Sequence, residues 1–334
     1  MRYKYLDYAK GMGILLIMMH HVFQYFPATN SIALYVQGYH VTIFFIVSGM
    51  IAYMKKDRNE PIKKILVKKI KSFIIPYIFF SIINSVIKLG ILFITHSLDN
   101  DIIREEMVAL LITGNGTVWF LSALFIIEII YEAIKKIRNV LGRNIVLITS
   151  AIVTMVLPFI ISGIKTPVII VIARAMEGYS YYIIGYFTFD LLRNMSLKNA
   201  YSYILLAFGW IVWFVFPTKM GYMGAYFDYF VPTTLFNVFS CFGILILCIS
   251  LSRKIKENKI LSFIRYFGEN SLIIMLVHPT ILLVLTYLEK QYFAIWTKSI
   301  QIPFAVVLFV TLVFLEVPFI KLINNKMSFL IGKF

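Results

Sequence analysis

Residues 6–22, LDYAKGMGILLIMMHHV, decide the fold class, because they join the length and apolarity of a membrane span to several ionisable side chains. Asp7 and Lys10 lie at the start of the stretch, and His20 and His21 lie deep inside it. Ionisable groups are costly in hydrocarbon, so those found inside a span usually have a functional role. The stretch therefore predicts a membrane-spanning helix that contributes to a functional site.

Helical geometry places His21, rather than His20, on the side of the charged start. At about 100° per residue, Asp7, Lys10 and His21 fall on one narrow face, while His20 lies roughly 140° from Asp7. The rise from Asp7 to His21 is about 21 Å, so the two would mark the ends of a path from the membrane surface towards its middle. A second interpretation is that His21 only hydrogen-bonds a neighbouring helix.

The composition of the whole chain is that of a polytopic membrane protein. Of its 334 residues, 60% are hydrophobic and 14% are charged, and the mean hydropathy is +0.84. Apolar runs of about 17–25 residues are long enough to cross a bilayer. We therefore expect an all-α integral membrane protein with one domain over residues 1–334, no soluble domain, and about ten transmembrane helices near 9–26, 39–54, 72–95, 117–134, 145–162, 168–190, 200–216, 232–251, 270–288 and 300–321.

The net charge of +16 is mostly a signal of membrane topology. With the N-terminus inside, 25 of the 32 Lys and Arg residues fall in cytoplasmic pieces, 5 fall outside and 2 lie within spans. Cytoplasmic loops carry such an excess of Lys and Arg, so both termini are expected in the cytoplasm. No small-residue cleavage site follows the first apolar run, which is therefore expected to stay as a span. The charge gives no support to nucleic-acid binding.

The most basic loop begins at residue 55 and reads KKDRNEPIKKILVKKIKSFIIPY. It leads straight into the third span. One interpretation is anchoring at the cytoplasmic surface with attraction to anionic lipids. The other is a site for an anionic cosubstrate, such as the phosphates of a nucleotide-like carrier. Charge alone leaves both open.

Two outer segments have distinctive patterns. Residues 101–111, DIIREEMVALL, are apolar along one helical side, which predicts a short helix in the membrane interface. Residues 217–231 surround Asp228 with aromatic rings that would either stack on sugars or form an interfacial belt: Tyr222, Tyr226, Phe227 and Tyr229.

Further ionisable residues lie within the predicted spans. Arg174 and Glu177 are three residues apart and are expected to pair along their helix. Glu128 and Glu316 have no evident local partner in the sequence. Ionisable groups in this setting favour an enzyme or a transporter over a plain scaffold.

Two more histidines accompany apolar stretches. His40 begins the second span, ahead of a predicted small-residue packing site at Ser48 and Gly49. His278 lies in the ninth span. The two cysteines share one apolar run and indicate neither a disulfide framework nor a metal site. The sequence contains no Walker loop, GxSxG elbow, HExxH or CxxC motif.

Five of these stretches, taken together, resemble the type 3 membrane acyltransferase family, especially its fucose 4-O-acetylase-like branch. DYAKGMGILLIMMHH resembles the D-x-x-K-G-x-G-I…H opening helix, with the family histidine on His21. YHVTIFFIVSGMIAY resembles the second helix, VKKIKSFIIPY the basic lead into the third, TVWFLSALF the start of the fourth and GENSLIIMLVHP a late helix. The resemblance covers the whole chain in the same order.

The chain departs from the family pattern in two respects. The basic lead is often R-x-x-R in the family, whereas Lys69 and Ser72 stand here, with Lys71 beside them. Lysine keeps the charge but not the bidentate geometry of arginine. Some relatives carry an extracytoplasmic esterase-like domain. Without one, the protein is expected to acylate its acceptor directly or to pass the acyl group to a separate partner.

The resemblance implies an O-acyltransferase with no bound cofactor. It would move an acyl group, expected to be acetyl, from cytoplasmic acyl-CoA to a hydroxyl of a cell-surface polysaccharide or its precursor. A sugar hydroxyl needs a base within hydrogen-bond reach, and histidine suits that role near neutral pH. We predict His21 as base or acyl relay, and His40 and His278 as residues for acceptor positioning or proton relay, without requiring all three to converge.

The remaining predicted roles concern the donor and the support of the site. Lys10 and the lysines before the third span would hold the donor phosphates: Lys68, Lys69 and Lys71. Asp7 would orient Lys10, and three further residues would support the site: Glu128, Arg174 and Glu177.

Two other functions stay open from the residues. The protein would alternatively be a transporter or flippase of a glycan precursor, with the charged residues lining a passage, or a scaffold of a polysaccharide assembly machinery. A lysine-rich and cysteine-poor chain without a cleavable signal suits the plasma (inner) membrane of a bacterium.

Overall fold

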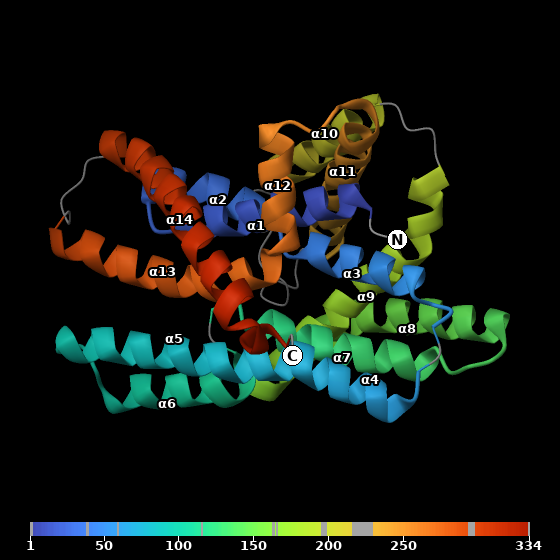
Figure 1. Cartoon of the computed structure of the whole chain (residues 1–334), viewed down its shortest axis with the longest axis horizontal. Helices are drawn as coiled ribbons and strands as arrows, with labels where there is room; N and C mark the ends of the chain where they lie inside the picture. The colour runs from blue at the N-terminus through green and yellow to red at the C-terminus, as the bar shows by residue number, and fades with distance from the viewer. Residues whose placement is uncertain are drawn as a thin grey trace.

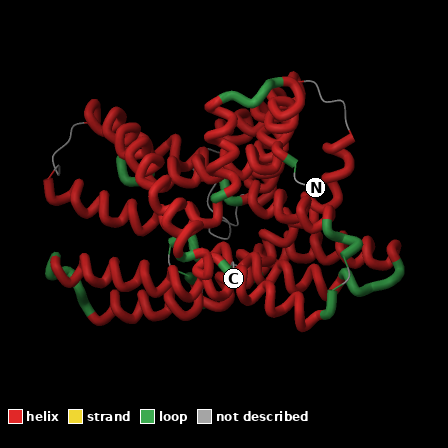
Figure 2. The backbone as a smooth tube through the Cα atoms, viewed as in Figure 1, coloured by secondary structure: helices red, strands yellow, loops and turns green. Residues whose placement is uncertain are grey.

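The computed structural model of the chain describes residues 3–37, 40–58, 60–114, 116–161, 164, 166–194, 199–215, 230–292 and 298–332. Over these residues the protein consists of helices joined by loops, with no strand (Figure 2). The predicted all-α class is therefore confirmed. The aromatic loop around Asp228 lies outside the described residues.

The helices follow one another in chain order as labelled in Figure 1. They are α1 (Lys4–Phe23), α2 (Asn30–Gln37), α3 (Thr42–Met54), α4 (Ile62–Lys69), α5 (Ile75–Ile94), α6 (Asn100–Val108), α7 (Trp119–Ile134), α8 (Val140–Ile160), α9 (Pro167–Asn194), α10 (Asn199–Val215), α11 (Phe230–Lys254), α12 (Lys259–Glu269), α13 (Ser271–Tyr292) and α14 (Lys298–Lys326). Short turns of other helical types are η1 (Pro27–Thr29), η2 (Ile70–Ile74), η3 (Ala109–Thr113) and η5 (Ser328–Ile331).

Every predicted span overlaps a helix of the structure. Within the described residues, six helices are long and apolar enough to cross a membrane: Ile62–Ile94, Val140–Pro158, Pro167–Asn194, Thr233–Lys254, Ser271–Leu288 and Ile300–Lys326. The helix α1 is not among them, and the charged and histidine residues that it contains reduce its apolar character. The chain is thus a multi-pass membrane protein, while the count of ten spans stays a prediction.

The helix α1 lies at the centre of the packing. Most of its residues are buried, including the polar Asp7 and His20. It contacts six other helices that come from both ends of the chain: α2, α3, α11, α12, α13 and α14. A helix surrounded in this way brings its ionisable residues against side chains from distant parts of the sequence.

The helices α3 and α9 pack closely through two glycines. A Cβ atom at Gly49 would overlap the backbone carbonyl oxygen of Tyr182, and one at Gly185 would overlap that of Ile46. Small residues allow membrane helices to approach backbone to backbone. The packing site predicted at Gly49 is therefore confirmed, with α9 as its partner.

The third predicted span is part of one long helix, Ile62–Ile94, in which α4, the π-helical turn η2 and α5 are continuous. The segment predicted to lie in the interface forms α6, whose N-terminus is capped by the Asp99 carboxylate. Figure 1 shows α6 running back alongside α5, and Lys88 of α5 forms an ion pair with Glu106 of α6. The helix at 101–111 was correctly predicted, but it lies along α5 because this ion pair and the contacts of η3 with α5 and α9 hold it there.

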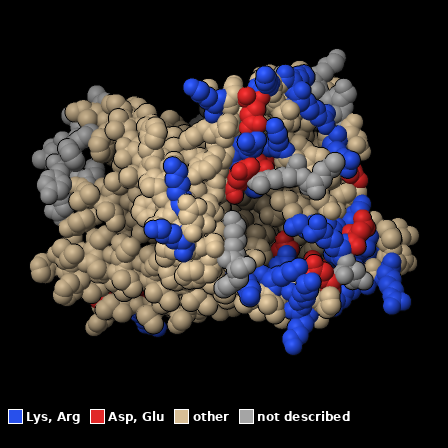
Figure 3. Space-filling model, in the orientation of Figure 1, with Lys and Arg blue, Asp and Glu red and all other residues tan. Residues whose placement is uncertain are grey.

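The charged side chains gather on one half of the face shown in Figure 3, while the other half is almost entirely uncharged. In the same orientation, the charged half covers α4 and α12, and the uncharged half covers α13 and the first part of α14 (Figures 1 and 3). Such asymmetry is typical of a membrane protein with its basic loops on one side.

Candidate active site

Four histidines form a continuous chain of ring contacts. The ring centroids are 4.9 Å apart for His40 and His20, 5.0 Å for His20 and His21, and 5.4 Å for His21 and His278. These residues come from α1, α13 and the turn before α3. The three predicted histidines therefore converge, and His20, which the helical-face argument set aside, links His40 to His21.

Two of these rings are oriented by backbone carbonyls. His20 Nδ1–H donates to the carbonyl of Ala33 on α2 at 2.9 Å, and His278 Nδ1–H donates to that of Ile274 at 2.7 Å. Because a carbonyl only accepts, the Nδ1 atom carries the proton in both rings. The Nε2 atom of His278 is buried and has no hydrogen-bond partner among the described residues. This nitrogen is left with a free lone pair beside His21.

A proline directly after His278 changes the hydrogen bonding of α13 beside the histidine chain. Pro279 lies inside α13 and has no N–H, so the carbonyl of Met275, four residues earlier, cannot receive its helical hydrogen bond. The hydroxyl of Thr117, just before α7, donates to this carbonyl instead. The pair ties the start of α7 to the kink-prone turn of α13.

His21 opens onto a cavity of about 350 Å³. Gln24 Nε2 lies 3.2 Å from His21 Nδ1, so the amide donates to an unprotonated ring nitrogen at the cavity wall. Further lining residues come from α5, α6, α13 and the loop before α7, and include Asn84, Lys88, Glu106, Gly116, Thr117, Pro279 and Thr280. The cavity thus combines a histidine with neutral and charged hydrogen-bonding groups.

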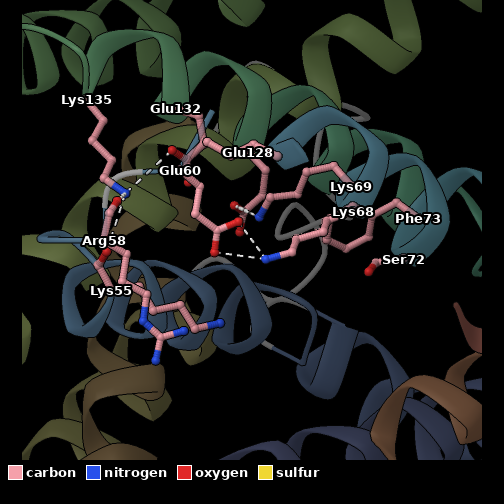
Figure 4. Close-up of a pocket in the computed structure, with 11 residues that line it drawn as sticks. Lys55, Arg58, Glu60, Lys68, Lys69, Ser72, Phe73, Glu128, Glu132 and Lys135 are labelled. Atoms are coloured by element: carbon pink, nitrogen blue, oxygen red, sulfur yellow. Dashed lines mark hydrogen bonds and ion pairs between the residues drawn. The ribbon is translucent and has the colours of Figure 1, made fainter. Parts of the chain in front are cut away.

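A second, basic cavity of about 340 Å³ lies at the other end of the long helix (Figure 4). Lys68 pairs with Glu60 at 2.6 Å, and Lys69 pairs with Glu128 of α7. Three further basic side chains that the sequence did not single out complete its wall: Lys55, Arg58 and Lys135. An adjoining basic cavity of about 520 Å³ shares Arg58 and Lys135 and adds Lys56, Lys136, Arg138 and Arg143.

Neighbouring charges shift the pKa values of side chains in this basic cavity. The hydrogen bond from Lys68 holds the pKa of Glu60 below its ordinary value. Burial, together with the neighbouring positive charge of Lys69, lowers the pKa of Lys55. A lysine whose charge is disfavoured in this way gains from an incoming anion.

The predicted donor residues divide into two groups. Lys68 and Lys69 line the basic cavity, whereas Lys10 and Lys71 do not. Lys10 pairs with the buried Asp7 at 2.9 Å on α1, which is the partnership expected from the sequence. Glu128, which had no evident partner in the sequence, has one in Lys69, because the fold brings α7 against the long helix.

The remaining intramembrane charged residues lie outside the two cavities. The guanidinium of Arg174 lies 4.8 Å from the centre of the Trp119 ring, a cation–π contact. Its predicted pairing with Glu177 stays a prediction. Both carboxylate oxygens of Glu316 are buried without a hydrogen-bond partner among the described residues. No group of three or more His, Cys, Asp or Glu within the described part of the chain is arranged to hold a metal ion.

One helix connects the two cavities. Lys69 lines the basic cavity and Asn84 lines the His21 cavity, and both lie on the continuous helix Ile62–Ile94. Fifteen residues separate them, which corresponds to about 22 Å at 1.5 Å per residue. The site therefore has an anion-binding end and a histidine end at a distance set by helical geometry.

Comparison with known proteins agrees with this architecture. The sequence model of an acyltransferase domain, that of the acyltransferase 3 family, matches residues 3–320. No curated protein and no solved structure matches the chain. The family match spans nearly the whole chain, including α1 with its histidines, both cavities and α13. The chain therefore belongs to the acyltransferase 3 family of membrane enzymes that transfer acyl groups.

Proposed function

We propose that the protein transfers an acyl group, expected to be acetyl, from acyl-CoA to a hydroxyl of a cell-surface polysaccharide or its precursor. The observation that carries the proposal is the pair of cavities joined by the helix Ile62–Ile94, one basic and one containing His21. CoA has the same layout, because a long pantetheine arm separates its phosphates from its reactive thioester. The bilayer would be the plasma membrane of a bacterium, with ten spans and both termini in the cytoplasm.

The donor phosphates would bind in the basic cavity. Lys68 and Lys69 now bind the carboxylates of Glu60 and Glu128, and phosphate oxygens would compete for the same ammonium groups. Lys55, Arg58 and Lys135 add positive charge around them. The number of basic residues in the two adjoining cavities suits a ligand with several phosphates.

His21 would activate the acceptor hydroxyl. Its Nδ1 atom accepts from the Gln24 amide at the cavity wall, and a hydroxyl that replaced this amide would donate to the same lone pair. The hydroxyl oxygen then attacks the thioester carbonyl carbon while its proton passes to His21. The C–S bond breaks, and the CoA sulfur leaves and receives that proton. His278, His20 and His40 would stabilise the imidazolium or share its proton through the ring chain.

The test is the ester-linked acyl content of cell-surface polysaccharide in three strains: gene deleted, wild type restored, and His21→Ala restored, with membrane abundance measured. The proposal expects esters to vanish on deletion, to return with wild type and to stay absent with an abundant His21→Ala protein. Full restoration by His21→Ala would contradict the assignment of His21. Failed polymer export with a normally acylated precursor would favour the transporter function instead.

A further inference from the structure

The His21 cavity contains a buried hydrogen-bond donor that the fold does not use. Asn84 of α5 is only 7% exposed, and its Nδ2 atom is buried with no hydrogen-bond partner among the described residues. Leaving a buried amide donor unsatisfied costs about 1–3 kcal/mol. Such groups are rare in native proteins and point to a ligand or another specific role.

The neighbouring Thr280 fixes which end of the Asn84 amide is available. The Thr280 hydroxyl on α13 donates to Asn84 Oδ1, so the oxygen is satisfied and the two N–H groups are not. Both residues line the His21 cavity. Thr280 of α13 therefore holds the Asn84 amide so that a neutral N–H donor lies in the wall of the His21 cavity.

Three other side-chain donors around this cavity each make one contact within the fold. The Gln24 amide donates to His21, the Thr117 hydroxyl donates to the Met275 carbonyl, and the Lys88 ammonium pairs with Glu106. Each contact orients part of the cavity wall. Asn84 Nδ2, by contrast, makes no hydrogen bond among the described residues, so a bound carbonyl or oxyanion would accept from it without breaking an existing bond.

We propose that Asn84 is a catalytic residue that donates a hydrogen bond to the carbonyl oxygen of the transferring acyl group, with Thr280 as its positioning residue. The inference rests on the acyl transfer proposed above. When the hydroxyl oxygen attacks the carbonyl carbon, the C=O electron pair moves onto the carbonyl oxygen. The Asn84 N–H stabilises this negative charge until the C–S bond breaks and the carbonyl re-forms, while the hydroxyl proton passes through His21 to sulfur. Preorganised donors of this kind are worth about 10²–10³ in rate.

The experiment compares Asn84→Asp and Asn84→Leu, which keep the approximate shape of the side chain but remove the N–H donors. The rate is measured as the incorporation of radiolabelled acetyl groups into surface polysaccharide during a short pulse, per amount of membrane protein. The matched control is Asn237→Leu, which removes a buried asparagine of α11 whose amide donates to the Tyr181 hydroxyl. We expect losses of about 100-fold or more for both Asn84 variants and a rate within about twofold of wild type for the control, since Asn237 lines neither the His21 cavity nor the basic cavity.

A measurement of acetyl-CoA binding distinguishes a catalytic role of Asn84 from a role in folding. The probe is acetyl-CoA added to the purified full-length protein, with the ligand-induced rise in thermal stability as the readout. The Asn84 variants are expected to keep this rise, since the phosphates bind some 22 Å away along the helix. Thr280→Val, which removes the orienting hydroxyl, is expected to lose part of the rate, and Thr280→Ser to keep it.

Three results would overturn the proposal. The first is an Asn84→Asp or Asn84→Leu protein that retains more than a tenth of the wild-type rate. The second is loss of the acetyl-CoA response in both variants, since Asn84 would then serve binding or folding. The third is a wild-type protein without an acetyl-CoA response whose deletion leaves the esters intact, since the underlying acyl transfer would itself be wrong.

Discussion

The rings of His21 on α1 and His278 on α13 lie with their centroids 5.4 Å apart, although 257 positions separate the two residues in the sequence. The Nε2 atom of His278 is buried without a hydrogen-bond partner among the described residues, and its Nδ1–H is held by the Ile274 carbonyl. A free acceptor nitrogen beside a candidate base would take up or return a proton. The contact therefore gives His278 a defined part in the proposed chemistry.

Replacement of His278 by glutamine is expected to lower the rate of acyl incorporation by about 100-fold, the lower end of the range for a residue that transfers a proton. This rate is measured as the incorporation of labelled acetyl groups into surface polysaccharide per amount of membrane protein. The matched control is His96→Gln, because His96 follows α5 outside the histidine chain. A rate for abundant His278→Gln close to wild type would show that the ring contact is only structural.

Replacement of Thr117 by valine is expected to destabilise the protein by about 1–3 kcal/mol, because the Met275 carbonyl would be buried without a donor. Pro279→Ala restores a backbone N–H that can donate to this carbonyl, so the double variant is expected to lose less stability than the sum of the single changes. Thermal denaturation of the wild type, the two single variants and the double variant in one detergent measures these stabilities. Strict additivity of the two changes in stability would mean that Thr117 and Pro279 act independently. Thr117→Ser is the control, because it keeps the hydroxyl and should have the stability of the wild type.

Replacement of Lys69 by methionine is expected to weaken acetyl-CoA binding by roughly 10–100-fold, because a charge-assisted hydrogen bond is worth about 1.5–3 kcal/mol. The concentration dependence of thermal stabilisation gives the affinity. Lys63→Met is the control, since Lys63 lies on the same helix but does not line the basic cavity. Equal losses for the two variants would indicate general attraction to anions rather than a site.

Replacement of Gly49 by alanine is expected to destabilise the protein strongly, because the added Cβ would overlap the Tyr182 carbonyl and separate α3 from α9. Gly90→Ala is the matched change, since nothing lies within 4 Å of a Cβ at that position on α5. There, alanine is expected to stabilise the helix by up to about 1 kcal/mol. Membrane abundance and thermal denaturation report both effects, and similar behaviour of the two variants would contradict the close α3–α9 packing.

The sequence predicts what depends on local composition. Apolar length locates the helices, and the family resemblance selects His21 and the lysines at 68 and 69. Gly49 is found because small residues in an apolar run have few other uses. Each of these signals is contained in one short stretch.

The parts of the site that depend on tertiary contacts are not accessible in this way. Lys55 and Lys135 stand in different loops, and only the fold places them in one wall. Asn84 is an ordinary residue of an apolar helix until its unsatisfied amide is seen beside Thr280. His20 is set aside by a helical-face argument that assumes one functional face, whereas α1 is surrounded by helices on several sides.

The continuous helix from Ile62 to Ile94 limits how this chain can change in length. A single insertion between Lys69 and Asn84 would turn one cavity by about 100° relative to the other, whereas substitutions on its outer side would leave their register intact. Homologues are therefore expected to vary in composition on the outer side of this interval but hardly at all in its length.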